Sequence, residues 1–428
     1  MNAALPAASL APTPPSALAA PAPLWSDRLG PLVRDQAAHA RALVTRLAPV
    51  MDWPAVIAGA TPWVEAVRAT PAPFWALESL LREYPISSAE GLALMRLAEA
   101  LLRVPDTETA VALAADQLGR AGFDGAAGGE HHWLADLSAQ AISLSKKFLP
   151  EEGGQAGLWQ RLGAKTVVAA TVRAIQLLGR QFVLGQDIGA ALDEARAQRR
   201  AEPAGREPLV FSFDMLGEGA RCDEDARRYL AAYAHAIEAI AQRQPAGAPE
   251  RGDGISIKLS ALHARYEIGH LALLREELLP RVRGLLDAAA RAGLNLTIDA
   301  EETERLELSL ILLDELAAHA ARHWPQWGGL GLAVQAYQLR ALETVEAVAA
   351  IARRHGIRFM VRLVKGAYWD AEVKRAQEAG LDGYPVFTHK HHTDLSYLAC
   401  ADALLHHRGV IYPQFATHNA GTIAAIVQ

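Results

Sequence analysis

The spacing of hydrophobic residues along the chain changes near residue 200. From residue 24 to about residue 200, apolar positions recur every three or four residues, the spacing that places them on one face of an α-helix. Beyond residue 207, short apolar runs alternate with helical patterns at intervals of roughly 40 residues. The sequence therefore predicts an all-helical part followed by repeated strand–helix units.

The second part contains six predicted strands, at residues 209–214, 255–259, 294–299, 330–335, 358–364 and 410–415. The intervening helices are predicted at residues 223–244, 271–291, 302–322, 341–354, 370–380 and 395–407, with a last one beginning near residue 421. Repeated strand–helix units imply a parallel sheet covered by helices.

Polar residues stand at or just beyond the C-terminal ends of these strands: Asp214, Lys258, Asp299, Gln335, Arg362 with Lys365, and His418 with Asn419. In a (β/α)8 barrel that edge carries the active site. No Gly-x-Gly-x-x-Gly follows a strand, which disfavours a doubly wound nucleotide-binding sheet. We therefore predict an α/β fold with a (β/α)8 barrel that stops about two units before closure.

Three regions are predicted along the chain. Residues 1–24 form a disordered Ala/Pro-rich leader without the pattern of a signal peptide. Residues 25–200 form a helical arm and α-domain, which serves dimerisation or support or is a helical domain of unknown purpose. Residues 207–428 form the incomplete barrel, after a charged linker at residues 198–206 that ends in Pro and Gly.

The helical region carries several local signals. Residues 87–90 form a capping box, a longer helix is predicted at residues 158–184, and a shorter one follows at residues 188–199. Trp53, Trp63 and Trp75 fall in short helical pieces broken by prolines, which suggests an arm laid over another surface.

Composition narrows the functional classes. A net charge of −6 argues against a general nucleic-acid binder. Two distant cysteines, Cys222 and Cys400, exclude a disulfide framework or cysteine metal cluster and suit a reducing cytosol. No apolar run is long enough to predict a membrane-spanning helix.

The sequence Arg-Leu-Val-Lys-Gly-Ala-Tyr-Trp at residues 362–369 is the strongest candidate wall of a ligand site, because it places cations and aromatics at a strand end. The histidine-rich residues 389–392 are predicted to form a solvated loop and no metal site. Glu301 and Glu302 are predicted to be ordinary charges at a helix N-terminus.

Two mechanisms fit these residues. Lys258 could form a Schiff base with a carbonyl substrate, as in an aldolase-like lyase. Alternatively, the cations could stabilise a reduced flavin near its N5 and N1 atoms, with Gln335 paired to the pyrimidine edge. The residues alone leave both open, along with a non-catalytic scaffold built on a decayed barrel.

The strand-end motifs resemble those of proline dehydrogenase, in the version found in the bifunctional proline utilization A family. The resemblance covers residue 60 to the end, in order. It rests on residues 73–76, 98–106, 213–218, 256–263, 298–302, 335–337, 362–369 and 415–419.

This resemblance implies FAD-dependent oxidation of L-proline to Δ1-pyrroline-5-carboxylate, the first step of proline catabolism to glutamate. Hydride would pass from proline C5 to flavin N5, and electrons would pass to a membrane quinone. The resemblance also implies a homo-oligomer, cytoplasmic and peripherally associated with the inner membrane. An NAD-dependent glutamate-semialdehyde dehydrogenase domain, with NAD as its cofactor, would lie downstream.

The resemblance also assigns roles to residues. Lys258, Asp299, Tyr368 and Arg362 are the implied catalytic group: Lys258 balances the substrate carboxylate, Asp299 orients the cations, Tyr368 shapes the pocket and Arg362 lies near flavin N5. The implied FAD-binding residues are Ala300, Gln335, Arg362, Val364, Lys365, Gly366, Ala367, Trp369, Thr388, His389, Lys390, Thr417, His418 and Asn419.

The sequence also departs from the family pattern. His389 stands where the family often has arginine. The seventh strand is absent, as is the eighth-strand helix with its paired arginines for the proline carboxylate. Because the leader carries no ribbon-helix-helix pattern, we expect no DNA-binding domain.

Overall fold

The computed structural model describes residues 29–70, 183–203, 205–244 and 247–428. The predicted leader, the capping box at residues 87–90, Trp75 and nearly all of the helix predicted at 158–184 lie outside these ranges. The described residues belong to two compact units. One comprises residues up to 50 together with 214–417, and the other comprises 51–213 together with 418–428.

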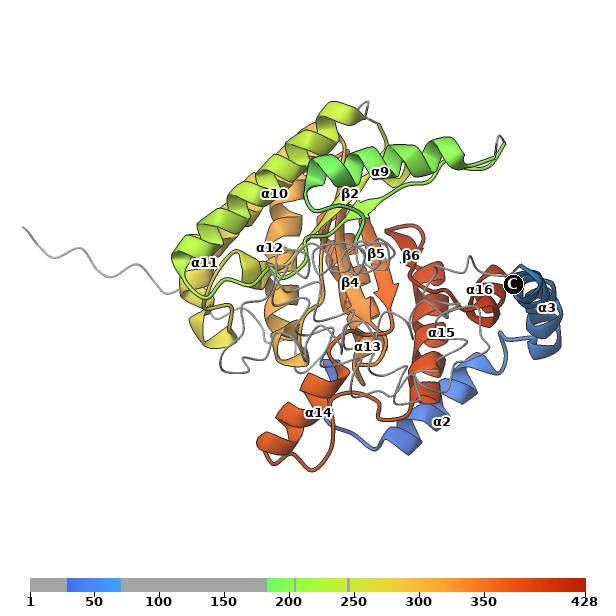
Figure 1. Cartoon of the computed structure of the whole chain (residues 1–428). Coiled ribbons are helices and arrows are strands. Elements are labelled where there is room, and N and C mark those ends of the chain that lie inside the picture. Colours follow the sequence, from blue (N-terminus) through green and yellow to red (C-terminus); the bar gives the residue numbers. More distant parts are fainter. Residues whose placement is uncertain (1–28, 71–182, 204, 245–246) are drawn as a thin grey trace, which may run out of the picture. The chain divides into compact units, whose positions relative to one another are not determined.

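A parallel sheet forms the core of the described barrel, confirming the predicted α/β fold. The strands are β1 (Ser212–Phe213), β2 (Gly254–Ile257), β3 (Asn295–Ile298), β4 (Leu330–Gln335), β5 (Phe359–Val364) and β6 (Ile411–Phe415). Their order in the sheet is their order in the chain, and each pair from β2 to β6 is parallel. This half-barrel brings the C-terminal ends of the strands to one edge (Figure 1).

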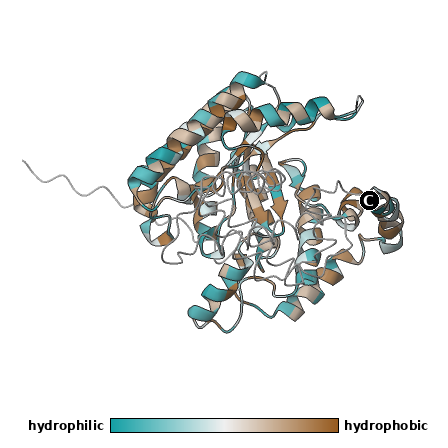
Figure 2. Ribbon diagram, in the orientation of Figure 1, coloured by the Kyte–Doolittle hydropathy of each residue, from teal (hydrophilic) through white to brown (hydrophobic). Residues whose placement is uncertain are grey.

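Helices cover the outer side of β2 to β6. They are α10 (Asp223–Arg243), α11 (Leu271–Ala292), α12 (Leu306–His323), α13 (Ala341–His355) and α15 (Lys390–His406), and α14 (Trp369–Glu378) follows the loop after β5. Strands β2, β3 and β4 are buried along their whole length. In Figure 2 the strands are mostly brown, whereas α10 and α11 show teal along their outer surfaces. The apolar strand runs are therefore the core, as a parallel sheet covered by helices requires.

Glycines end two of these helices in the way their sequences predict. Gly293 follows α11 with φ 67°, and Gly356 follows α13 with φ 65°. Each donates its backbone N–H to carbonyls of the last helical turn. This left-handed conformation is favourable for glycine, so the next strand begins within a few residues.

An N-terminal helix, α2 (Gln36–Leu47), belongs to the same unit as β2 to β6, whereas β1 belongs to the other unit. It packs against α15. Arg34 and Arg46 flank this contact, pairing with Glu343 at 2.6 Å and with Asp402 at 3.2 Å.

The second unit holds α3 (Trp53–Ala69), α9 (Ile188–Ala201) and α16 (Ala420–Val427), and α3 packs against α16. Trp53 and Trp63 lie in one continuous α3, so the predicted break at prolines is wrong there. Pro54 occupies the first turn, where no amide donor is needed, and Pro62 is accommodated inside the helix.

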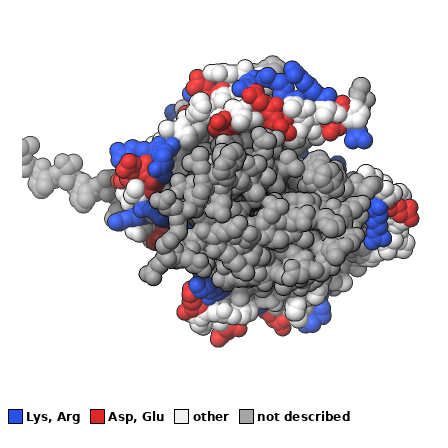
Figure 3. Space-filling view, viewed as in Figure 1, with Lys and Arg blue, Asp and Glu red and all other residues white. Residues whose placement is uncertain are grey.

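Three further local predictions differ from the structure. β1 has two residues where six were predicted. α9 extends to Ala201, into the predicted linker. α15 begins at Lys390, so the predicted loop at residues 390–392 is instead the first helical turn. In Figure 3 the described Lys and Arg side chains are interspersed with Asp and Glu, and neither sign covers the described surface in view.

Candidate active site

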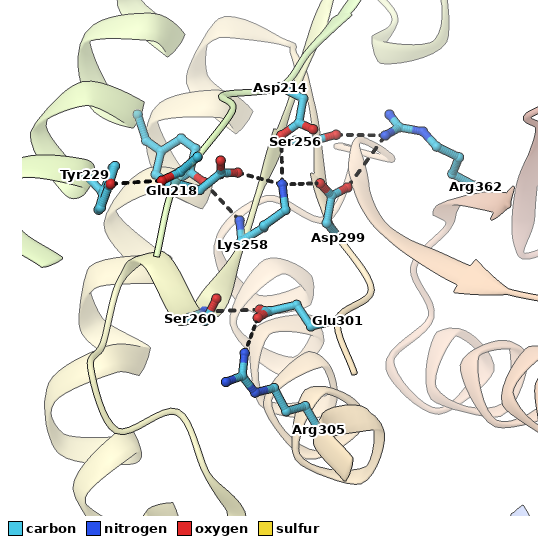
Figure 4. Close-up of polar contacts among 12 residues, drawn as sticks. Asp214, Glu218, Tyr229, Ser256, Lys258, Ser260, Asp299, Glu301, Arg305 and Arg362 are labelled. Carbon is cyan, nitrogen blue, oxygen red and sulfur yellow. Dashed lines mark hydrogen bonds and ion pairs between the residues drawn. The ribbon is translucent and has the colours of Figure 1, made fainter. Parts of the chain in front are cut away.

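Lys258, a largely buried lysine at the end of β2, is surrounded by carboxylates. The Nζ of Lys258 lies 2.6 Å from Glu218, 3.2 Å from Asp214 and 3.4 Å from Asp299 (Figure 4). Only 19% of the Lys258 side chain and 2% of the Glu218 side chain are exposed. The strand-end residues of β2 and β3 therefore meet with the segment after β1, as the sequence predicted for Asp214, Lys258 and Asp299.

Local backbone contacts fix this lysine. The Lys258 N–H donates to the hydroxyl of Tyr233 at 3.1 Å, and Tyr233 is fully buried on α10. The Asp299 N–H donates to the carbonyl of Ile257 at 2.9 Å, continuing the pairing of β2 with β3. The two side chains therefore leave neighbouring strands at the same level.

The charges of this cluster shift one another's protonation. Burial, together with the charge of Asp214, raises the pKa of Asp299 to about 6, although Lys258 and Arg362 oppose the shift. Burial also raises the pKa of Glu218. Burial disfavours a charged Lys258, but its three carboxylate partners outweigh this and raise the pKa of Lys258. Lys258 is thus a firmly protonated ammonium.

A second cation reaches the cluster from β5. The guanidinium of Arg362 donates to the Ser256 hydroxyl at 2.8 Å and lies 3.7 Å from Asp299. Asp299 therefore lies between Lys258 and Arg362, two cations carried by different strands (Figure 4). An anionic or electron-rich ligand at this edge would meet both positive charges.

The segment after β5 folds against a glycine and a tyrosine. Gly366 has φ 142°, and a Cβ there would lie 2.5 Å from the ring of Tyr337. The Tyr337 hydroxyl is buried next to the backbone of Tyr368. Gln335 is buried, donating to the Glu301 carbonyl at 2.8 Å and accepting from the Ala367 N–H at 3.1 Å. Gln335 thus joins the loop after β3 to the loop after β5.

Two more predicted ligand-binding lysines converge on one carboxylate. The ammonium groups of Lys365 and Lys390 both bind Asp394 on α15. Burial opposes the ionisation of Asp394, but the hydrogen bonds from both lysines outweigh it and lower the pKa of Asp394. Two cations held around one acidic oxygen pair are suited to an anionic group such as a phosphate.

The remaining predicted residues fall in several places. Ala300 and Val364 are half-buried at the strand ends, and Tyr368 precedes α14. The Trp369 indole donates to the Phe387 carbonyl at 3.0 Å. Thr388 donates its N–H and hydroxyl to Gln36 of α2, and the exposed His389 precedes α15. Thr417 is the last residue of the larger unit, and Asn419 caps α16 in the other unit, directly after His418.

Sequence reasoning missed three residues that organise this edge. Glu218 lay within residues 213–218, a motif that carries the family resemblance, but it follows no predicted strand directly, and no role was predicted for Asp394. Glu301 was predicted to be a helix N-terminal charge, and this is wrong. It is buried before the helix, accepts from the Ser260 N–H at 3.1 Å and binds Arg305. The sequence signal that could have identified Glu218 and Glu301 is that each is an acidic residue next to a strand-end motif.

Within the described ranges, no three His, Cys, Asp or Glu side chains are arranged to hold a metal ion. None of the described helices combines the length and apolar character needed to cross a membrane.

The decisive comparison is with protein families. The family model described as "Proline dehydrogenase" matches residues 197–428, more than half of the chain. This chain belongs to the proline dehydrogenase family. The resemblance inferred from the strand-end motifs is therefore confirmed.

Relatives and solved structures agree with this membership. "Bifunctional protein PutA" of Klebsiella aerogenes is 42% identical over 359 residues, and that of Rhizobium meliloti is 41% identical over 356 residues. Each alignment covers 82% of this chain, and the chain spans about a quarter of these relatives' length (27% and 28%). A crystal structure of Proline Utilization A from Bradyrhizobium japonicum is 44% identical, with a TM-score of 0.66, covering 93% of this chain and 40% of that one.

The expectation that the chain carries no DNA-binding domain is wrong. A second family model, described as "DNA-binding domain of Proline dehydrogenase", matches residues 76–182. The expectation rested on the overall negative charge and on the lack of a ribbon-helix-helix pattern in the leader, and neither property describes residues 76–182. The whole of the matched segment lies outside the described residues.

Proposed function

We propose that this chain forms the FAD-dependent, L-proline-oxidising part of a bifunctional proline-catabolic enzyme, with Δ1-pyrroline-5-carboxylate as product. The carrying observation is that Lys258, Asp299 and Arg362 meet at the strand-end edge of a chain that belongs to the proline dehydrogenase family. This edge is where (β/α)8 enzymes place their chemistry.

The residues present fit FAD. Gly366 leaves no room for a side chain at the strand end, and Lys365 and Lys390 gather positive charge around Asp394. When bound, FAD would supply N5 as the acceptor of hydride from proline C5. The residues proposed to hold it are Ala300, Gln335, Arg362, Val364, Lys365, Gly366, Ala367, Trp369, Thr388, His389, Lys390, Thr417, His418 and Asn419.

The chain's own side chains would bind and orient proline. Lys258, kept protonated by its carboxylates, would balance the substrate carboxylate. Asp299 would hold Lys258 and Arg362 in place, and Tyr368 would close one side of the pocket. Hydride loss from an amine requires an unprotonated nitrogen. Solvent would take the proton, because Lys258 already holds its own tightly.

A Schiff-base lyase is the competing enzymatic proposal. It requires a lysine with a lowered pKa, and the environment of Lys258 raises that pKa instead. The two are separated by one experiment on the full-length protein. Proline should bleach the yellow flavin absorbance, whereas a lyase would give a covalent adduct on Lys258 after borohydride is added with a carbonyl substrate. If neither the bleaching nor the covalent adduct is observed, the remaining proposal is a non-catalytic scaffold.

The broader setting is part of the same proposal. The relatives named bifunctional support a downstream NAD-dependent glutamate-semialdehyde dehydrogenase domain. Family resemblance supports a membrane quinone as electron acceptor, a homo-oligomer, and a cytoplasmic protein peripherally bound to the inner membrane. Vesicles containing quinone should accelerate reoxidation of the proline-reduced protein if this electron path is correct.

A further inference from the structure

A buried carboxylate joins the two loops that frame the strand-end site. Glu372 on α14 is only 2% exposed. One carboxylate oxygen accepts the Thr303 N–H at 2.7 Å and the other accepts the Thr303 hydroxyl at 2.6 Å. Because both oxygens bind one residue, the contact fixes both the distance and the orientation between α14 and the loop after β3.

The burial of the Glu372 carboxylate makes its hydrogen bonds to Thr303 important for stability. Placing a carboxylate in the interior costs free energy unless hydrogen bonds replace its water. Burial raises the pKa of Glu372, and the two hydrogen bonds from Thr303 oppose that shift. A glutamine could keep both contacts, because its carbonyl would accept the Thr303 N–H and its NH2 group would donate to the Thr303 hydroxyl oxygen. Glu372→Ala removes both contacts and leaves the two Thr303 donors without this partner.

The contact between Glu372 and Thr303, called the clamp below, holds the backbone next to Tyr368. The Glu372 N–H donates to the Tyr368 carbonyl at 2.9 Å, so Tyr368 lies one turn before Glu372. Burial raises the pKa of the Tyr368 hydroxyl, and the charges of Lys258 and Asp299 also act on it. Tyr368 therefore lies in the electrostatic reach of the lysine–carboxylate cluster.

Other contacts run parallel to the clamp. Gln335 joins the Glu301 carbonyl to the Ala367 N–H, and Arg375 binds Glu302 at 3.3 Å and Glu304 at 2.8 Å. The Arg375 pairs are half-exposed and therefore weak. The Glu372–Thr303 contact is the buried one on α14.

We propose that Glu372 is a positioning residue that sets substrate affinity by holding Tyr368 at the proline pocket through Thr303. This inference rests on the proposed function, because it takes Tyr368 as part of that pocket. Glu372 itself touches no reacting atom. Its loss should therefore affect the Michaelis constant for proline more than the chemical step.

A double-mutant cycle on the full-length protein tests the proposal. Tyr368→Phe and Glu372→Ala should each raise KM for proline about fivefold, with kcat within about twofold and FAD affinity unchanged. The KM of the double variant should not exceed that of the more impaired single variant, because Glu372 acts only through Tyr368. Glu378→Ala, on an exposed position of the same helix, is the matched control and should leave KM unchanged.

Two outcomes overturn the inference: a double variant whose effects on KM multiply, or a Glu372→Ala protein with wild-type KM. If Glu372→Ala does not fold, Thr303→Ala, which removes one of the two hydrogen bonds, takes its place, with Thr303→Ser as the variant expected to restore KM. A wild-type protein whose flavin is not reduced by proline refutes the proposed function instead, so the two failures are distinguishable.

Discussion

At the scale of single residues, the site is defined by one carboxylate shared between two cations. Asp299 lies 3.4 Å from Lys258 and 3.7 Å from Arg362. Its raised pKa means that small changes of pH alter the charge on which both cations depend. Removing Asp299 would leave both cations without the carboxylate they share, whereas removing Arg362 leaves Asp299 paired with Lys258.

The first prediction concerns the pH dependence of Asp299. Its pKa is raised to about 6, so we expect activity to fall as the pH decreases through 6, because the protonated carboxyl no longer attracts Lys258 and Arg362. The ratio of kcat/KM between wild type and Asp299→Asn isolates this effect. A ratio that stays constant between pH 5 and pH 8 would contradict the prediction.

The same shift has a defined effect on stability. An aspartate in the unfolded chain has a pKa near 3.9, so between about pH 4 and pH 6 the folded protein binds a proton that the unfolded chain does not. The contribution of Asp299 to the free energy of unfolding therefore decreases as the pH rises across that window. Urea unfolding of wild type and Asp299→Asn at pH 4.5 and pH 7 measures this difference.

The second prediction concerns Arg362. Arg362→Met keeps the apolar stem but removes the guanidinium that binds Ser256 and faces Asp299. We expect the rate of flavin reduction by proline to fall by about a hundredfold, with little change in the unfolding temperature. Stopped-flow absorbance measures the rate, and Arg322→Met, on an exposed position, controls for loss of charge alone. Unchanged reduction kinetics would refute the assigned role.

The sequence predicts the residues that stand directly at the ends of strands. Lys258, Asp299 and Arg362 were predictable because the ends of parallel strands meet at one edge. Glu218, Asp394 and Glu372 were not, because an acidic residue in or near a helix gives the same local pattern whether it is solvated or buried against a distant partner. Burial and pairing are properties of the tertiary structure.

At the scale of elements, the strand–helix alternation was sufficient to predict the half-barrel and most element boundaries. The errors occur where local rules compete with packing. Pro62 predicted a break, yet α3 continues through it. The histidines after His389 predicted a loop, but they begin α15, which is buried over much of its length. Tertiary packing outweighs weak local preferences in both cases.

The third prediction concerns the turn after β5. Gly366→Ala combines an unfavourable backbone conformation at φ 142° with a contact of 2.5 Å to the Tyr337 ring. We expect a loss of roughly 1 to 3 kcal/mol in the free energy of unfolding and weaker FAD binding, because Lys365 to Tyr368 must shift. Urea unfolding and flavin fluorescence titration measure the two effects.

The matched control for this turn is Gly380→Ala. Gly380 also has positive φ, 64°, but an added Cβ would meet nothing within 4 Å. It should cost about 1 kcal/mol from backbone strain and leave FAD affinity unchanged. Equal effects of the two substitutions on FAD binding would show that the Tyr337 contact has no role.

At the scale of the whole molecule, residues distant in sequence complete the larger unit. Residues 25–200 were assigned to a helical region, yet α2 groups with the strands, and Gln36 and Thr388 are 352 positions apart. Helical periodicity shows that α2 has a buried face but does not show which surface covers it. The partner of an amphipathic helix was therefore beyond sequence reasoning.

The last prediction tests this long-range contact. The Gln36 carbonyl oxygen accepts both the N–H of Thr388 at 2.9 Å and its hydroxyl at 3.1 Å. In Gln36→Ala two partly buried donors lose their partner, which should lower the free energy of unfolding by about 1 to 3 kcal/mol. The exposed Arg41→Ala on the same helix should change it by less than about 0.5 kcal/mol. Calorimetry of both variants decides the matter: equal unfolding temperatures would mean that α2 does not stabilise the segment that begins α15. A selective loss in Gln36→Ala would show that this N-terminal helix supports the proposed cofactor-binding segment.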